Sequence, residues 1–185
     1  MLESFFARPA PIVARELIGA LLTVDGVGGE IVETEAYAPD DPASHSFRGP
    51  TARNASMFGP PAHAYVYRIY GLHWCFNMVA ERGSAILIRA LEPQFGVDEM
   101  IARRRTSELK HLCAGPGRLC EALAIDRRHD GRDLSRSPFS LSLAPHRAAI
   151  VTTSRIGVRE QKVAELRFCK AGSRYLSRSV AKQET

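Results

Sequence analysis

The chain has 185 residues, enough for one domain with a sizeable hydrophobic core, and its 45% hydrophobic and 24% charged residues are those of an ordinary globular protein. Its net charge is +5, and only four of its 25 basic residues are lysine, which leaves 21 arginines. Arginine binds phosphate and stacks on bases, so this balance favours a nucleic-acid partner; an arginine-rich proteome from a GC-rich genome is the alternative. The apolar stretch at residues 17–24 is too short to span a membrane, and no secretory signal precedes it, so a cytoplasmic protein is expected.

In chain order, the first predicted element is a helix with Pro11 in its first turn, running to about Leu22. Three glycines within residues 25–29 predict a turn, and an acidic strand follows over residues 30–37. The polar stretch at residues 39–61 predicts a long loop, of a kind that is usually functional or disordered.

Three strands are predicted next, over residues 64–69, 73–79 and 85–91, with a hairpin turn at residues 70–73 between the first two. The remainder of the chain alternates between short elements and breaks. We expect a basic helix over residues 98–112, a break at 115–117, a helix over 118–125, a charged loop over 126–138, and short strands within 139–176.

Metal and redox motifs are not apparent in the sequence. No C-x-x-C pair occurs, which disfavours zinc and thioredoxin-like sites, and the histidines lack the spacing of metal ligands. We therefore predict no metal, and we expect reduced, mostly buried thiols at the four cysteines, Cys75, Cys113, Cys120 and Cys169.

The acidic strand carries the first candidate catalytic group. Side chains alternate across a strand, so Glu33, Glu35 and Tyr37 share one face and the residues between them share the other. Glutamate is ionised at neutral pH, so Glu35 could activate a water for attack on a sugar carbon. Glu33 is a weaker candidate, and an exposed strand face is the structural alternative. No lysine lies between residues 1 and 109, which favours direct hydrolysis over a Schiff-base mechanism.

Tyrosines cluster around the predicted hairpin. Three of the five lie within six residues, at Tyr65, Tyr67 and Tyr70, and a fourth is Tyr37. Aromatic faces stack on bases and attract cationic rings, which suits an alkylated base, whereas an aromatic core is the alternative for Tyr65 and Tyr67. Tyr70 is poorly placed for a core and well placed to fill the gap left by an extruded base.

Two polar residues lie within apolar strands. A buried charge needs a partner, so Arg89 is expected to pair with Glu35, although Glu92 and Asp98 are alternatives. Asn77 could form a hydrogen bond with a base edge, though most strand asparagines have no such role.

Taken together, these residues resemble the mammalian-type alkyladenine (3-methyladenine) DNA glycosylase family. The agreement in order and spacing extends over most of the chain, so it is far more specific than any one motif. It covers residues 33–37, 45–46, 51–54, 57–58, 65–67, 70–71, 77, 87–93, 113–120, 155–158 and 167–168.

The resemblance implies a monofunctional enzyme that flips a damaged purine out of double-stranded DNA and hydrolyses its N-glycosidic bond, leaving an abasic site. It implies that Glu35 is the general base, and that Arg89 and the backbone of Ile156 help to hold the attacking water. It implies no metal and no cofactor. The candidate bases are 3-methyladenine and 7-methylguanine, with hypoxanthine and ethenoadenine left open because no general acid is apparent.

The same resemblance assigns the base-binding residues. Tyr37, His45 and Tyr67 would form the walls that stack on the flipped base, with His45 also contacting its edge. Tyr70 would intercalate through the minor groove. Asn77 would crowd the exocyclic amino group of normal guanine.

The fold that the resemblance implies is one mixed α/β (α+β) domain over residues 1–185, with a curved antiparallel β-sheet, flanking helices, a protruding β-hairpin and about eight loose residues at the end. A monomer would suffice to flip one base, and a bacterial, nucleoid-associated form is expected. Leu72 and His73 depart from the family pattern, and residues 126–145 match poorly, so they receive no role.

Two other functions compete with a glycosylase. The family fold resembles a tRNA-binding domain of formyltransferases that lacks this chemistry, so a non-catalytic nucleic-acid-binding domain is possible; Glu35 together with Tyr70 argues against it. A nucleoside hydrolase is the second alternative, for which an intercalating tyrosine and 21 arginines would serve no purpose.

Overall fold

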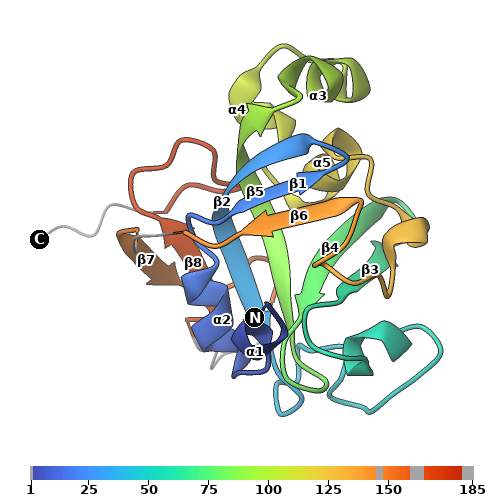
Figure 1. Cartoon of the computed structure of the whole chain (residues 1–185). Helices are drawn as coiled ribbons and strands as arrows, with labels where there is room; N and C mark the ends of the chain where they lie inside the picture. The colour runs from blue at the N-terminus through green and yellow to red at the C-terminus, as the bar shows by residue number, and fades with distance from the viewer. Residues whose placement is uncertain (1, 145–147, 159–164, 181–185) are drawn as a thin grey trace, which may run out of the picture.

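An antiparallel sheet, curled into a half-barrel, runs through the computed structural model, which describes residues 2–144, 148–158 and 165–180 (Figure 1). Within these residues the sheet has eight strands, six of them in the order β3-β4-β5-β2-β1-β6, while β8 pairs with both β2 and β7. The strands are β1 (Leu21–Val24), β2 (Val27–Tyr37), β3 (Ala64–Ile69), β4 (His73–Val79), β5 (Ala85–Phe95), β6 (Phe139–Ser142), β7 (Ile150–Thr153) and β8 (Arg167–Lys170).

Short helices flank this sheet in two groups (Figure 1). Helices α1 (Leu2–Phe6) and α2 (Ala10–Glu16) lie together near the N-terminus, and α2 packs against β2 and β5. Helices α3 (Val97–Arg104), α4 (Leu109–Leu112) and α5 (Pro116–Ala122) gather at the other end of the sheet, where α5 packs against β4 and β5. Two 3-10 turns, η1 (Ala55–Phe58) and η2 (Arg127–His129), lie in connecting loops. The single mixed α/β domain with its antiparallel sheet confirms the expected fold.

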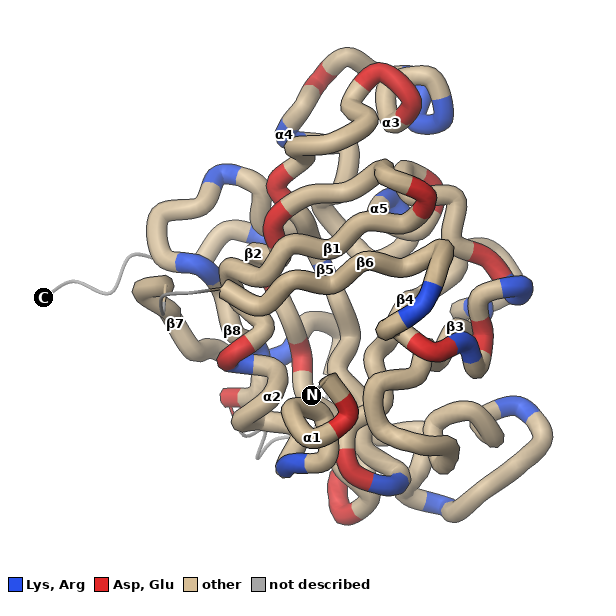
Figure 2. The backbone as a smooth tube through the Cα atoms, in the orientation of Figure 1, with Lys and Arg blue, Asp and Glu red and all other residues tan. Residues whose placement is uncertain are grey.

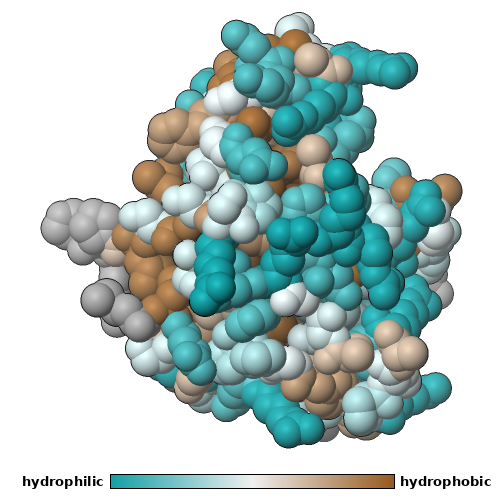
Figure 3. Space-filling view, turned by 45° about the vertical axis from the view of Figure 1, so that its right-hand side comes forward, coloured by the Kyte–Doolittle hydropathy of each residue, from teal (hydrophilic) through white to brown (hydrophobic). Residues whose placement is uncertain are grey.

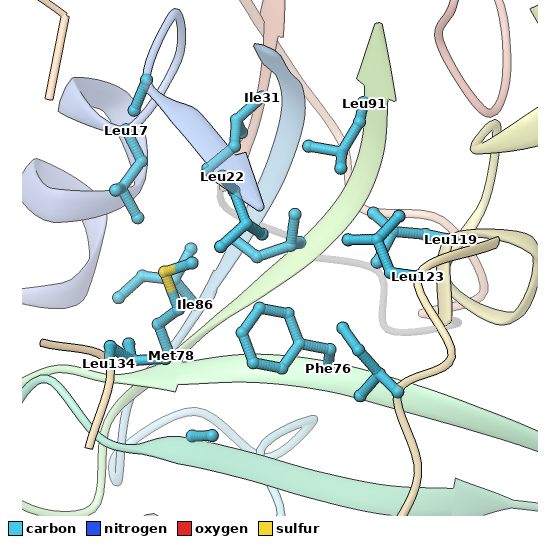
Figure 4. Packing of buried hydrophobic residues seen from close by; sticks show 14 of the residues in the cluster. Leu17, Leu22, Ile31, Phe76, Met78, Ile86, Leu91, Leu119, Leu123 and Leu134 are labelled. Atoms are coloured by element: carbon cyan, nitrogen blue, oxygen red, sulfur yellow. The ribbon is translucent and has the colours of Figure 1, made fainter. Parts of the chain in front are cut away.

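The main hydrophobic core fills the space between the sheet and the helices. Figure 4 shows Leu22, Phe76 and Leu91 pointing toward one another from three different strands, with Leu119 of α5 closing one side. All four side chains are fully buried. This core holds β2 and β5 side by side, and these two strands carry the charged residues of the candidate site.

The face assignment along β2 needs one correction. Thr34 and Ala36 face α2 and the core as predicted, and the Thr34 hydroxyl donates a hydrogen bond to the carbonyl of Ala14 at 2.8 Å. Val32 does not share that face, because the pairing of β2 with β5 is irregular around Glu33. A β-bulge of this kind shifts the alternation by one residue, so Ile31 enters the main core instead.

The strand predictions after residue 60 are confirmed, but the predicted C-terminal end of the first helix is wrong. It stops at Glu16, and Leu22 lies in β1, where it pairs with Gly29 of β2. An apolar run of this length does not distinguish a buried strand from a helix, and Gly19, with φ +93°, breaks the helical path. The predicted turn is also shorter, because β2 already begins at Val27.

The predicted helix over residues 98–112 is two helices, α3 and α4. Arg105 adopts a left-handed conformation, φ 52°, which ends α3. The predicted break at residues 115–117 is confined to Gly115, since Pro116 begins α5 in the position where a missing N–H is tolerated. The expected loose end of the chain falls mainly on residues 181–185, which lie outside the described residues.

Charged residues of both signs occur along the backbone, as Figure 2 shows. The face in Figure 3 is mostly hydrophilic, with hydrophobic residues gathered mainly at its left edge. Within the described part of the chain, no helix is both long and apolar enough to cross a membrane.

Candidate active site

Glu35 lies at the centre of the candidate site and is completely buried on β2. Its carboxylate accepts three hydrogen bonds: from the Tyr37 hydroxyl at 2.8 Å, from the backbone N–H of Ile156 at 2.7 Å, and from Nη1 of Arg89 at 3.2 Å. The exposed-strand alternative is therefore wrong. The structure brings Glu35, Arg89, Tyr37 and Ile156 together, as the sequence predicted.

Arg89 lies on β5 beside Glu35 and bridges two carboxylates. Its Nε donates to Glu33 at 3.1 Å while Nη1 reaches Glu35. Burial by itself would lower the pKa of Arg89, but the charges of Glu35 and Glu33 outweigh burial and raise the pKa, so the guanidinium stays charged. The predicted pairing of Arg89 with Glu35 is thus confirmed, and Glu33 is a second partner of Arg89.

An aromatic cavity lies next to this charged centre. Its empty space is about 370 Å³, the open mouth included, and it is lined by Tyr37, Ala43, His45, Met57, Tyr65, Tyr67, Asn77 and Ala85. Glu35 does not line the cavity, but the Tyr37 hydroxyl connects the two. Burial raises the pKa of Tyr37, and the neighbouring Glu35 raises it further, so this hydroxyl remains protonated and donates.

His45 and two tyrosines form the inner walls. The ring centroids of His45 and Tyr67 are 4.5 Å apart, and those of Tyr65 and Tyr67 are 5.4 Å apart. Nδ1 of His45 and the Tyr65 hydroxyl share a hydrogen bond of 2.8 Å. Burial lowers the pKa of His45 and Arg53 lowers it further, which favours the neutral imidazole. The sequence left Tyr65 between a base-stacking and a core position, because alternation alone does not separate a cavity wall from a core; the structure places it in both, as a cavity wall that packs in a small buried cluster.

The loop after β2 is folded so that His45 faces the cavity. The side chain of Asn54 donates to the carbonyls of His45 and Gly49, at 2.8 and 3.1 Å, and its own oxygen accepts from the Thr51 N–H. Asn54 is 4% exposed, so these bonds are shielded from water. A single asparagine therefore fixes the turn that carries His45.

Asn77 and Tyr70 belong to the β3–β4 hairpin. Asn77 is buried, lines the cavity, and donates from Nδ2 to the Tyr65 carbonyl at 3.0 Å. Tyr70 lies in the turn with φ 50° and is 88% exposed, and Leu72 beside it is 69% exposed. The predicted exposure of Tyr70 at the hairpin tip is confirmed, while its insertion into DNA stays a prediction.

Arg155 is a site residue that the sequence analysis did not assign. Its guanidinium lies 4.6 Å from the centroid of the Tyr37 ring, donates to the Ala36 carbonyl at 3.0 Å, and forms an ion pair with Asp41. It braces the tyrosine that connects the cavity to Glu35. These partners lie more than 110 positions away along the chain, so local patterns carry no sign of the contact.

Most of the residues that line the cavity lie in a long stretch of the sequence without acidic residues. Residues 42–80 contain no Asp or Glu, but they include Arg48, Arg53 and Arg68. In Figure 2, the part of the loop after β2 that lies at the lower right has blue segments and no red ones. Because a phosphate backbone repels carboxylates, the lack of acidic residues is a sequence signal that could have drawn attention to this part of the chain.

Metal ligands and disulfides are not seen around the site. In residues 2–144, 148–158 and 165–180, no three His, Cys, Asp or Glu side chains are grouped to hold a metal ion. All four cysteines are free and buried, which confirms the expectation for the thiols.

Comparison of the sequence with known proteins identifies the family of this chain. The model of the methylpurine-DNA glycosylase (MPG) family matches residues 4–174. A protein of Rhizobium meliloti is 56% identical over 94% of both chains, and one of Nitrosospira multiformis is 53% identical over 94% of this chain and 91% of its own. A third, of Rhizobium johnstonii, is 54% identical over 96% and 89%. Each carries the name "Putative 3-methyladenine DNA glycosylase". The chain belongs to the methylpurine-DNA glycosylase family.

Proposed function

We propose that this DNA glycosylase flips damaged purines out of duplex DNA and hydrolyses the N-glycosidic bond with a water activated by Glu35, leaving an abasic site. The observation that carries the proposal is a completely buried carboxylate connected through one tyrosine hydroxyl to an aromatic cavity. The proposed substrates are 3-methyladenine and 7-methylguanine, with hypoxanthine and ethenoadenine as further candidates. The enzyme acts as a monomer, without metal or cofactor.

The chemistry proposed for Glu35 follows from its contacts. Each carboxylate oxygen has two lone-pair sites, so the three donors among the described residues leave one acceptor site of Glu35 free for a water. Arg89 and the Ile156 backbone orient the carboxylate and hold that water. The water oxygen bonds to the sugar C1′, the C1′–N bond breaks, and the water proton passes to Glu35. A base made cationic by alkylation takes the bond electrons and leaves neutral, so it needs no general acid.

The cavity walls supply recognition. The faces of Tyr37 and Tyr67 stack on the flipped base and attract a cationic ring. A neutral His45 does not repel that cation and can form a hydrogen bond with the base edge. Tyr70 enters the duplex at the place that the base has left, and its exposure favours duplex DNA over free nucleosides as the substrate.

Base release from duplex oligonucleotides tests this function. Substrates carrying 3-methyladenine, 7-methylguanine, hypoxanthine or ethenoadenine are compared with undamaged duplex, and the free base is detected by chromatography. We expect release of the cationic bases and no strand cleavage without added alkali. Binding of DNA without release of any base would favour the non-catalytic domain, and release from nucleosides alone would favour the nucleoside hydrolase.

Asn77 gives a separate prediction on specificity. Its buried amide is held toward the cavity by the Tyr65 carbonyl, where it would meet the exocyclic amino group of guanine. We expect Asn77→Ala to raise the ratio of guanine to hypoxanthine excision about 10-fold, since a pocket contact contributes roughly 1–3 kcal/mol to discrimination. The measurement is single-turnover excision from matched duplexes, and an unchanged ratio would remove Asn77 from the discrimination.

A further inference from the structure

Glu33 has no part in the proposed chemistry, yet it is completely buried two residues from Glu35. It accepts four strong hydrogen bonds. Nε of Arg167 donates at 2.7 Å and Nε of Arg89 at 3.1 Å. The backbone N–H and the hydroxyl of Ser177 donate at 2.6 and 2.8 Å. A buried carboxylate with this many donors is held in one orientation, because any rotation breaks several bonds.

Glu33 and Glu35 hold the Arg89 guanidinium from two sides. The Nε end is held by Glu33, and the Nη1 end is presented to Glu35. Arg167 adds a second guanidinium, so two carboxylates and two guanidiniums, all nearly buried, balance one another in charge. The planar fork of arginine transmits the orientation of one end to the other, which a flexible lysine would not do.

The other half of this arrangement comes from the C-terminal segment, residues 175–178. Ser177 binds Glu33, and the Arg178 carbonyl accepts a hydrogen bond from Nη2 of Arg167 at 2.5 Å. Tyr175 is 7% exposed and packs in a small cluster with Val32 and other buried residues behind the site. The segment lies just beyond residue 174, where the match to the family model ends.

We propose that Glu33 is a positioning residue for this reaction: fixed by Arg167 and Ser177, it holds Arg89 so that Nη1 meets Glu35. Residues 175–178 thereby complete the active centre. The Ser177 hydroxyl also accepts two long hydrogen bonds from Nε and Nη2 of Arg89, both at 3.4 Å, while the described contacts of this segment reach neither the base cavity nor Glu35. The inference rests on the proposed role of Glu35 and extends it to residues behind the reacting atoms.

The test separates the chemical step from DNA binding. Glu33→Gln is assayed by single-turnover excision of the best lesion base, and binding is measured on a duplex with a tetrahydrofuran abasic analogue. We expect the excision rate to fall 10- to 100-fold, since small misplacements of catalytic groups have effects of this size, while the dissociation constant changes less than about 3-fold. Glu30→Gln is the matched control, because Glu30 lies on the same strand but is only partly buried and pairs with Lys170.

A double-mutant cycle tests the route through Arg89. Arg89→Lys keeps the charge but loses the fork, so Glu33→Gln should lower the rate less than about 3-fold in that background. Ser177→Ala removes the hydroxyl that donates to Glu33 and accepts from Arg89, and it changes no charge. It should lower the rate about 3- to 10-fold at unchanged melting temperature, whereas Ser179→Ala at an exposed position should not.

Two results would overturn the inference alone: wild-type excision by both Glu33→Gln and Ser177→Ala, or losses for Glu33→Gln and Arg89→Lys that combine additively. Absence of base release by the unsubstituted protein from every lesion would overturn the proposed function together with this inference.

Discussion

Glu35→Gln is expected to lower the single-turnover rate of base release by about 10²- to 10⁴-fold, the usual contribution of a positioned general base. The amide has nearly the shape of the carboxylate but cannot take a proton from water. Excess enzyme is mixed with duplex containing 3-methyladenine or 7-methylguanine, the reaction is quenched at set times, and the free base is quantified. This single-turnover rate does not depend on the release of the abasic DNA product from the enzyme.

Folding has to be measured beside this variant, because both oxygens of Glu35 accept hydrogen bonds. An amide NH₂ at either position would face a donor, and leaving one partner of a buried charged pair unmatched is destabilising by up to about 3–5 kcal/mol. Arg89 keeps Glu33, so the cost here should be lower than that. Retained binding to the abasic-analogue duplex shows that the site is intact, and the Glu30→Gln control should keep full activity. An intact fold with wild-type turnover would rule out Glu35 as the base.

Tyr70→Ser is expected to reduce excision from duplex DNA roughly 5- to 150-fold and to leave excision from single-stranded DNA nearly unchanged. One base–aromatic stack contributes about 1–3 kcal/mol, and that contribution is needed only where a base leaves a paired stack. The measurement is the ratio of single-turnover rates on the same lesion in duplex and single-stranded oligonucleotides.

Tyr70→Phe provides the matched control, since it keeps the ring and removes only the hydroxyl. It should retain most of the duplex activity. Because Tyr70 is 88% exposed, neither substitution should change the free energy of unfolding by more than about 0.5 kcal/mol. Equal losses on duplex and single strands would show that Tyr70 acts on something other than the vacated stack.

The strands and the pair Glu35–Arg89 could be predicted from the sequence because they follow from local rules. Short runs rich in β-branched and aromatic residues, separated by turn residues, define β3, β4 and most of β5. The cost of a lone buried charge predicts a carboxylate partner for Arg89. Family resemblance added the roles of the tyrosines, which alternation alone left divided between core and cavity.

The parts that could not be predicted depend on distant segments or on irregular backbone. The bulge near Glu33 moves Val32 to another face of the sheet, and no residue type in the strand indicates where the bulge lies. The contacts of Arg155 with Tyr37 and of Ser177 with Glu33 join residues more than 110 positions apart. Leu22 was assigned to a helix because a short apolar run does not distinguish a helix from a buried strand, and one of its strand partners, Leu141, lies 119 positions away.

Because Ser177 lies 144 positions after Glu33, the hydrogen bonds between these two residues can form only late in synthesis on the ribosome. Glu35, Arg89, the residues that line the aromatic cavity and the hairpin tip have all been translated by residue 89, whereas Ser177 is translated 88 residues later. A nascent chain therefore contains the residues that are proposed to contact a damaged base before it contains Ser177, which binds Glu33. The proposed positioning of Arg89 through Glu33 can form only after Ser177 has been translated, so we expect chains that end before Ser177 to excise bases more slowly.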